Sequence, residues 1–180
     1  SLSNEQRMLL QNTYDGFIRS GANLDEAGKE RFRKISAEMS LLTLNFSQNN
    51  LKETNAYELV LTPEDLDGLP ESTREAYAQN ATERGKEGQY VVTLHAPSFV
   101  PFMKYSTRRD LRKQLYMAYN TQCTHDNEYN NVEIVKRLVN LRLERAQLLG
   151  FSTAADFVLT RRMAENSENV YNLLDQLLKA

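Results

Sequence analysis

The sequence contains no tryptophan, one cysteine, two histidines, four prolines and seven glycines in 180 residues. A lone cysteine, Cys123, excludes an internal disulfide and suits a reducing compartment. Because glycine and proline, which interrupt helices, are scarce, the composition favours a mainly helical, soluble chain. The two histidines do not form an HExxH pair, so the sequence lacks a helix-borne zinc site of that kind.

Charge and hydropathy exclude two classes of partner. The chain has 22 Lys and Arg against 24 Asp and Glu, a net charge of −2, so no basic field points to nucleic acid. No apolar run approaches the roughly 18 residues that a membrane-spanning helix needs, and the amino terminus lacks a signal-peptide pattern. We therefore expect no nucleic acid and no membrane partner, and a cytoplasmic protein, with the periplasm as the alternative.

Residues with reactive side chains form no recognisable catalytic or metal motif. There is no GxxxxGK[ST] loop, and Gly85 and Gly88 are turn residues rather than a phosphate cradle. Cys123 lies near His125, but a cysteine hydrolase needs an orienting third group and an oxyanion donor, so this alternative is remote. His125 with Asp126 and Glu128 matches no metal-ligand spacing. The predicted catalytic and metal-ligating residues of this chain are therefore none.

Residues 132–157 are the stretch around which the chain is organised. They predict one long helix, a stop at Gly150 and the start of a second helix. At about 100° per residue, one broad arc holds ten apolar residues: Val132, Ile134, Val135, Leu138, Val139, Leu141, Leu143, Ala146, Leu148 and Leu149. An arc this wide predicts a helix buried among several others.

Two arginines, Arg142 and Arg145, fall inside that apolar arc and are the candidate site residues. Buried charges need partners, and Asp156 or Glu144 would serve. Buried arginines also hold ligand carboxylates bidentately. Pairing within the fold is the favoured interpretation, and a place in the wall of a channel is the alternative.

Local signals predict the remaining elements. Capping boxes are predicted at residues 3–6 and 107–110, each opening a helix. Asp25 caps a second helix whose apolar stripe ends near residue 48, and its short link to the first helix predicts an antiparallel hairpin. Residues 57–61 and 89–95 read as neighbouring strands, with the direction of their pairing left open. Further elements are a helix at 71–84, a connector or irregular helix at 96–102, a loop at 120–131 and a last helix opened by Asn166 and Ser167.

Together these signals predict a mainly α fold, a multi-helix bundle with an N-terminal helical hairpin and a small two-stranded β element. We expect one helical region over residues 1–180: a hairpin at 1–55, a small β-α-β insertion at 56–96 and a helical bundle at 97–180. The last apolar helix shows no stop signal before residue 180, so we expect the chain to be part of a larger protein.

Three stretches carry a resemblance to a known family. They are LKETNAYELVLTPEDLDGLPES (51–72), GQYVVTLHAPSFVPFMKYSTRRDLRKQLYMAY (88–119) and LRLERAQLLGFSTAADFVLTRRMA (141–164). In this order they resemble the thimet-oligopeptidase-like zinc metallopeptidases, with the bacterial peptidyl-dipeptidase (dipeptidyl carboxypeptidase) branch as the nearest match and oligopeptidase A next. No single motif is diagnostic, but the joint pattern is specific.

The resemblance implies a large helical enzyme with a deep channel that cleaves oligopeptides, releasing C-terminal dipeptides in this branch. It also implies zinc held by an HExxH helix and a downstream glutamate, with the glutamate of the motif as general base. All of these groups lie beyond the matched segments, so none is transferred to a residue of this chain. We therefore expect a non-catalytic, inactive segment that binds no zinc and whose partner is the remaining catalytic half of the parent chain.

The alternative function is a stand-alone helical protein-interaction module without enzymatic activity. Its sign would be a complete, capped final helix. A segment separated from the rest of a channel enzyme would expose apolar surface, so we also expect self-association.

Overall fold

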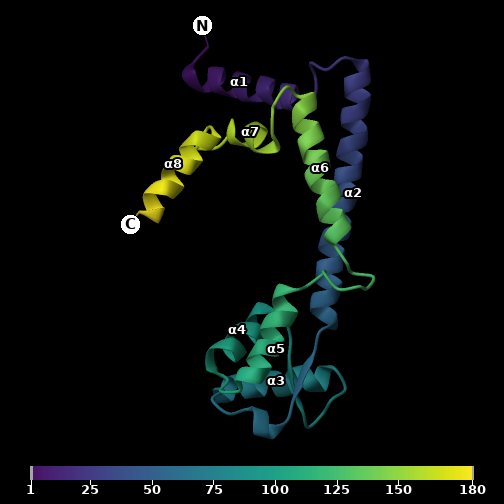
Figure 1. Ribbon diagram of the computed structural model, residues 1–180, viewed down its shortest axis with the longest axis vertical. Coiled ribbons are helices and arrows are strands. Elements are labelled where there is room, and N and C mark those ends of the chain that lie inside the picture. Colours follow the sequence, from purple (N-terminus) through teal and green to yellow (C-terminus); the bar gives the residue numbers. More distant parts are fainter. Residues whose placement is uncertain (1, 180) are drawn as a thin grey trace. The chain divides into compact units, whose positions relative to one another are not determined.

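The computed structural model describes residues 2–179 and is mainly α-helical, as the sequence predicts (Figure 1). The described residues form eight α-helices, one 3-10 turn and one two-stranded sheet. They divide into two compact units. Ser1–Thr43 and Ile134–Ala180 form the first, here called the helical unit, and Leu44–Glu133 form the second, here called the αβ unit. The predicted three-part division of one region stays a prediction.

The helices of the helical unit are α1 (Asn4–Arg19), the first part of α2 (Glu26–Ala56), α6 (Val132–Leu148), α7 (Ala154–Leu159) and α8 (Ser167–Leu178). Three of them, α1, α2 and α8, begin where the sequence predicts caps. The Ser3 hydroxyl accepts the backbone N–H of Gln6 at 3.2 Å, which closes the predicted capping box. Asp25 accepts the Gly28 N–H at 2.7 Å, and Asn166 caps α8 by accepting the Asn169 N–H at 2.9 Å. These three predictions are confirmed.

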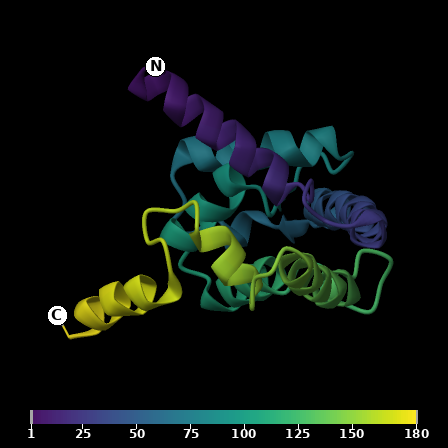
Figure 2. The same ribbon diagram turned by 90° about the horizontal axis from the view of Figure 1, so that it is seen from above.

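Within the helical unit, α2 and α6 lie side by side in both views (Figures 1 and 2). Ile35 of α2 and Leu141 of α6 are fully buried. Two bidentate ion pairs also join the helices. Arg31 donates to Glu144 at 2.5 and 2.6 Å, and Arg137 donates to Glu38 at 2.5 and 2.8 Å. Planar guanidinium–carboxylate pairs of this kind fix the register of the two helices.

The predicted antiparallel hairpin of α1 and α2 is not what the structure shows, because α1 runs across the direction of α2 (Figure 1). The link turns at Gly21, whose φ of 87° belongs to the left-handed region. Two polar side chains of α1 bond to the residues that directly follow α7 (Ala154–Leu159). Arg19 donates to Thr160 at 2.8 Å, and Asn12 accepts from Arg161 at 3.0 Å. Contacts distant in sequence therefore set the direction of α1.

The broad apolar arc of α6 is only partly buried, so the prediction of a central, surrounded helix is wrong for this structure. Leu138, Leu141 and Ala146 are buried, whereas Val135 and Val139 are 44% and 56% exposed. No residue of α1 or α8 is buried in the part of the chain that the structure describes. The outer end of α8 extends away from α7 (Figure 2). Self-association through such surface stays a prediction.

The αβ unit is built on a small antiparallel sheet. Its elements are β1 (Leu59–Leu61), the 3-10 turn η1 (Pro63–Asp65), α3 (Glu71–Glu83), β2 (Tyr90–Val92), α4 (Ala96–Tyr105) and α5 (Arg109–Asn120). Leu59 pairs with Val92 and Leu61 with Tyr90, which confirms that the two strands are neighbours and gives their direction. The irregular stretch predicted at 96–102 is α4, with Pro101 inside it.

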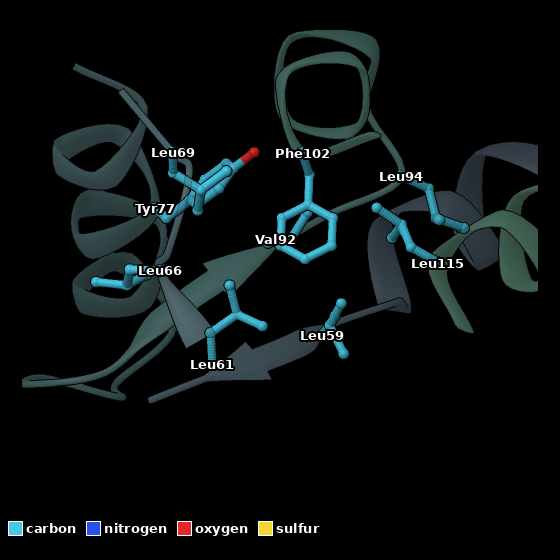
Figure 3. Close-up of a cluster of buried hydrophobic side chains, with 9 residues drawn as sticks. All are labelled: Leu59, Leu61, Leu66, Leu69, Tyr77, Val92, Leu94, Phe102 and Leu115. Atoms are coloured by element: carbon cyan, nitrogen blue, oxygen red, sulfur yellow. The ribbon is translucent and has the colours of Figure 1, made fainter. Parts of the chain in front are cut away.

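Nine buried side chains form the core of the αβ unit (Figure 3). Phe102 of α4 lies among residues from both strands, from α3 and from α5, and its ring centroid is 6.4 Å from that of Tyr77. The Tyr77 hydroxyl donates to the Ser98 carbonyl at 2.7 Å. The cluster comprises Leu59, Leu61, Leu66, Leu69, Tyr77, Val92, Leu94, Phe102 and Leu115.

One local prediction in the αβ unit is wrong, and another is confirmed. The helix α2 continues past the end of its apolar stripe to Ala56, within one residue of the predicted bound at 55, and this outcome is not an error of the prediction. Glu53 accepts the Cys123 N–H there, and Thr54 accepts from Gln122 at 2.7 Å. The capping box at 107–110 does not form. The Thr107 hydroxyl donates instead to the Asp67 carboxylate at 2.6 Å.

Candidate functional site

The sequence-predicted candidates Arg142 and Arg145 line one pocket of the helical unit. Its volume is about 540 Å³, and α6, α7 and α8 form its walls. We call it the arginine pocket; the argument below uses Arg142, Arg145, Phe157, Val158, Val170 and Tyr171 of its lining. The volume lies in the usual range of about 300–1,000 Å³ for small-ligand sites. The structure therefore brings both predicted residues to one concave surface.

Neither predicted carboxylate partner pairs with these arginines. Glu144 is held by Arg31, whose guanidinium lowers the pKa of that carboxyl. Asp156 accepts the Thr153 hydroxyl at 2.8 Å and also bonds Ser167 at 3.4 Å. Arg142 is exposed, and Arg145 is partly buried with its Nε atom buried and lacking a hydrogen-bond partner. A buried donor without an acceptor costs free energy, so the Nε atom of Arg145 carries such a cost in this fold.

The Phe157 ring lies against two guanidinium groups. Arg145 lies 5.5 Å and Arg19 3.9 Å from its centroid, and Phe151 packs edge-on against it at 5.3 Å. Cations over a ring face are stabilised by its quadrupole. Phe157 itself is buried, as the apolar pattern of residues 132–157 indicates.

Positive charge accumulates around Phe157. Burial lowers the pKa of Arg19, and the nearby charges of Arg161 and Arg145 lower it further. Asp15 raises the pKa of Arg19, and its effect is the smallest of the four. The positive charges of Arg19, Arg145 and Arg161 on this side of the helical unit therefore disfavour one another.

The arginine pocket fits binding rather than bond cleavage. Its lining residues include no carboxylate, histidine or cysteine, so none of them is an evident nucleophile or general base. What it offers is an apolar wall beside guanidinium donors. Guanidinium groups are suited to anionic oxygens, and the wall is suited to apolar groups.

Cys123 and His125 lie in the loop after α5, within the αβ unit, and do not form a hydrolase site. Cys123 is buried, and its backbone N–H donates to the Glu53 carboxylate. Burial, followed by the neighbouring carboxylate of Glu53, raises the pKa of the Cys123 thiol to about 11. His125 is near the same carboxylate, with Nε2 3.8 Å from Glu53 Oε1. A nucleophilic thiol needs a lowered pKa, so this environment acts against catalysis.

Alkylation of Cys123 is therefore expected to be slow. Near pH 8, a thiol pKa of about 11 rather than 9.0 leaves about a hundredfold less thiolate. Iodoacetamide should thus modify the native chain at least about a hundredfold more slowly than the urea-unfolded chain. The rate should rise about tenfold per pH unit until the pH approaches 11, provided the fold persists. Equal rates for native and unfolded chains, measured by intact mass, would contradict the assigned environment.

The donor atoms of this chain do not fit the zinc centre that the family resemblance implies. Among residues 2–179, no group of three or more His, Cys, Asp or Glu side chains converges in a way that would hold a metal ion. The ring nitrogens of His95 lie within 3.2 Å of Thr93 and 3.1 Å of Asn55. No catalytic step is therefore assigned through a metal on these residues.

No helix among residues 2–179 has the length and apolarity needed to cross a membrane.

Several residues of the arginine pocket environment were not identified from the sequence. Arg19 lies over the Phe157 ring and donates to Thr160, 141 positions away, and Asn12 accepts from Arg161, 149 positions away. No local pattern signals such distant contacts. The role of Glu53 was also missed, because its partner Cys123 lies 70 positions away.

Comparisons with known proteins find relatives along nearly the whole chain. Residues 102–180 match Peptidase family M3. Oligopeptidase A of Haemophilus influenzae is 36% identical over 96% of this chain and 26% of its own length. Oligopeptidase A of Escherichia coli is 33% identical over 99% of this chain and 27% of its own length. Dipeptidyl carboxypeptidase of Escherichia coli is 26% identical over 99% of this chain and 26% of its own length.

The chain thus spans about a quarter of the length of the curated relatives that it matches. Identity is higher with the two oligopeptidase A sequences than with the dipeptidyl carboxypeptidase, so the predicted branch stays a prediction. The resemblance carried by residues 51–72, 88–119 and 141–164 is confirmed at the level of the family. The chain belongs to the thimet-oligopeptidase-like family of peptidases, Peptidase family M3.

Proposed function

We propose that this chain is a non-catalytic helical segment of an oligopeptidase-type peptidase. The observation that carries the proposal is the similarity to proteins named oligopeptidase A over nearly the whole chain, together with the match of residues 102–180 to Peptidase family M3. The segment contributes scaffold and part of a peptide-binding wall. No observation favours the stand-alone interaction module.

In this proposal the chemistry belongs to the remaining catalytic half of the parent protein. That half would hold zinc on an HExxH motif, and the metal would supply Lewis-acid chemistry for the scissile carbonyl and for a bound water. The residues of this chain bind and orient, because the guanidinium groups of the arginine pocket suit a peptide carboxylate. The finer proposal is the release of C-terminal dipeptides, and the similarity to a dipeptidyl carboxypeptidase supports it. A cytoplasmic location is part of the same proposal.

The test compares the natural full-length protein containing this sequence with the chain of residues 1–180. The full-length protein is expected to cleave an internally quenched oligopeptide and to lose activity with a zinc chelator. The chain alone is expected to cleave nothing and to bind no stoichiometric zinc.

Mass spectrometry of the products then tests the finer proposal, because dipeptide release and internal cleavage give different fragments. Cleavage by the chain alone would overturn its non-catalytic role. An inactive full-length protein without an HExxH motif would overturn the peptidase assignment.

A further inference from the structure

We infer that one apolar side of α8 is the docking surface for an amphipathic helix from the remainder of the parent chain. This surface, here called the α8 stripe, comprises Val170, Leu173, Leu174, Leu177 and Leu178. The choice of the parent chain as the partner rests on the proposed function. The surface itself rests on the spacing and the exposure of these five side chains.

The first argument is that α8 leaves its apolar side uncovered. Counted from Val170, the stripe residues lie at positions i, i+3, i+4, i+7 and i+8, which is the spacing of one face of a helix. The four leucines of the stripe are between 52% and 86% exposed. Single exposed apolar residues are common on protein surfaces, but a contiguous group of this kind marks an interaction surface.

The second argument is that α8 is anchored only through its first half. Asn166 caps its first turn, and Val170 and Tyr171 line the arginine pocket together with Val158 of α7. No residue of α8 is buried within the described range 2–179, and its far end lies apart from the other helices of its unit in both views (Figures 1 and 2). A helix of 12 residues is marginal in water unless its apolar face is packed. The second half of α8 therefore needs a partner.

The charge of α8 disfavours a lipid surface as that partner. Helices that lie on membranes carry Lys and Arg on their polar face, which attract anionic lipids. The charged residues of α8 are Glu168 and Asp175, both acidic. An anionic lipid surface would therefore repel the polar side of this helix, so a protein partner fits better.

The area of the α8 stripe decides between a second copy and the parent chain. Five apolar side chains of this size offer on the order of 500 Å², less than the roughly 800 Å² per partner that a stable interface buries. A second copy that docks through this stripe alone would be held weakly. A helix of the same polypeptide acts at an effective concentration of about millimolar, so a small contact is enough to hold it.

The similarity to longer proteins indicates that the parent has enough further chain to supply such a helix. The chain spans only about a quarter of the length of both oligopeptidase A relatives. The match of residues 102–180 to the family includes all of α8, so this helix belongs to the shared region. A partner helix with apolar residues at the same spacing would fit the stripe, since helix faces recognise one another through such anchors.

The test is amide hydrogen exchange, read by mass spectrometry, on the chain of residues 1–180 and on the natural full-length protein that contains it. The amides of residues 172–178 are expected to exchange about tenfold or more slowly in the full-length protein, because a covered helix opens less often. The amides of α4 are the internal control. They should exchange equally in both proteins, because Phe102 holds α4 in the core of the αβ unit.

Leu177→Gln tests the stripe itself. In the full-length protein it should speed exchange of residues 172–178 by about tenfold, because an apolar contact is lost while glutamine keeps a high helix propensity. In the chain alone the change should stay within about twofold, since no partner helix is present to lose. Asn172→Gln is the matched control. It introduces the same residue on the polar side of α8 and should leave exchange unchanged in both proteins.

Three results would overturn the inference. One is equal exchange of residues 172–178 in the wild-type chain and the wild-type full-length protein, a comparison that needs no variant to fold. Another is unchanged exchange in full-length Leu177→Gln. The third is exchange in the chain alone that slows to the full-length value as its concentration rises, which would assign the stripe to a second copy. No step requires cleavage, so an inactive full-length protein with a protected α8 would overturn only the peptidase function.

Discussion

Replacing Phe102 with alanine is expected to lower the free energy of unfolding of the αβ unit by about 3–5 kcal/mol. Phe102 is fully buried and joins side chains from both strands, α3 and α5 (Figure 3). Truncation removes its apolar contacts and leaves a cavity that the short strands and α4 cannot fill without moving. It also removes the ring that packs against Tyr77.

The measurement is urea denaturation followed by circular dichroism. Val100→Ala is the matched control, since Val100 lies on the same helix and is 54% exposed. Its change should be small, within about 0.5 kcal/mol. A loss of less than about 1 kcal/mol for Phe102→Ala would mean that this cluster is not a close-packed core.

The sequence predicts those elements whose signals are local. Ser3, Asp25 and Asn166 each meet a backbone N–H three residues on, so a short window holds both the donor and the acceptor. The alternation of Tyr90, Val92 and Leu94 likewise predicts a common face, and the core cluster or its margin contains all three. Such predictions succeed because no distant residue competes for the same groups.

Predictions fail where a distant partner competes. Thr107 has the spacing of a cap residue, yet Asp67, 40 positions away, accepts its hydroxyl. The short link before Asp25 predicts a hairpin, but α1 instead bonds the residues that follow α7, through Arg19 to Thr160 and Arg161 to Asn12. Local propensity is a weak prior, and tertiary contacts override it.

For the candidate site, too, the sequence predicts the residues but not their partners. Arg142 and Arg145 stand out in the sequence because they interrupt an apolar arc, and the structure places both on one pocket. Their predicted partner Glu144 belongs instead to Arg31, 113 positions away. A helical wheel shows where a charge lies on its own helix, whereas the partner depends on how helices pack.

Replacing Gly68 with alanine is expected to lower the free energy of unfolding of the αβ unit by about 2–5 kcal/mol, from left-handed backbone strain and a steric clash. Gly68 has a φ of 81°. A Cβ there would lie far inside van der Waals contact of the Tyr105 carbonyl oxygen, and 3.1 Å from Thr107 Cγ2. The neighbouring backbone cannot easily withdraw, because the Thr107 N–H donates to the Asp67 carbonyl at 3.2 Å.

Gly85→Ala separates the two causes. Gly85 also has a left-handed φ, 69°, but no atom lies within 4 Å of a Cβ built there. It should therefore show only the conformational cost, about 1–2 kcal/mol. The excess for Gly68→Ala in urea denaturation then measures how tightly the segment after η1 is held against the junction of α4 and α5. Equal losses for the two variants would show that the backbone relaxes away from the clash. A larger loss at Gly68 means that the Asp67–Thr107 contact, which displaces the predicted cap of α5, is a rigid part of the αβ unit.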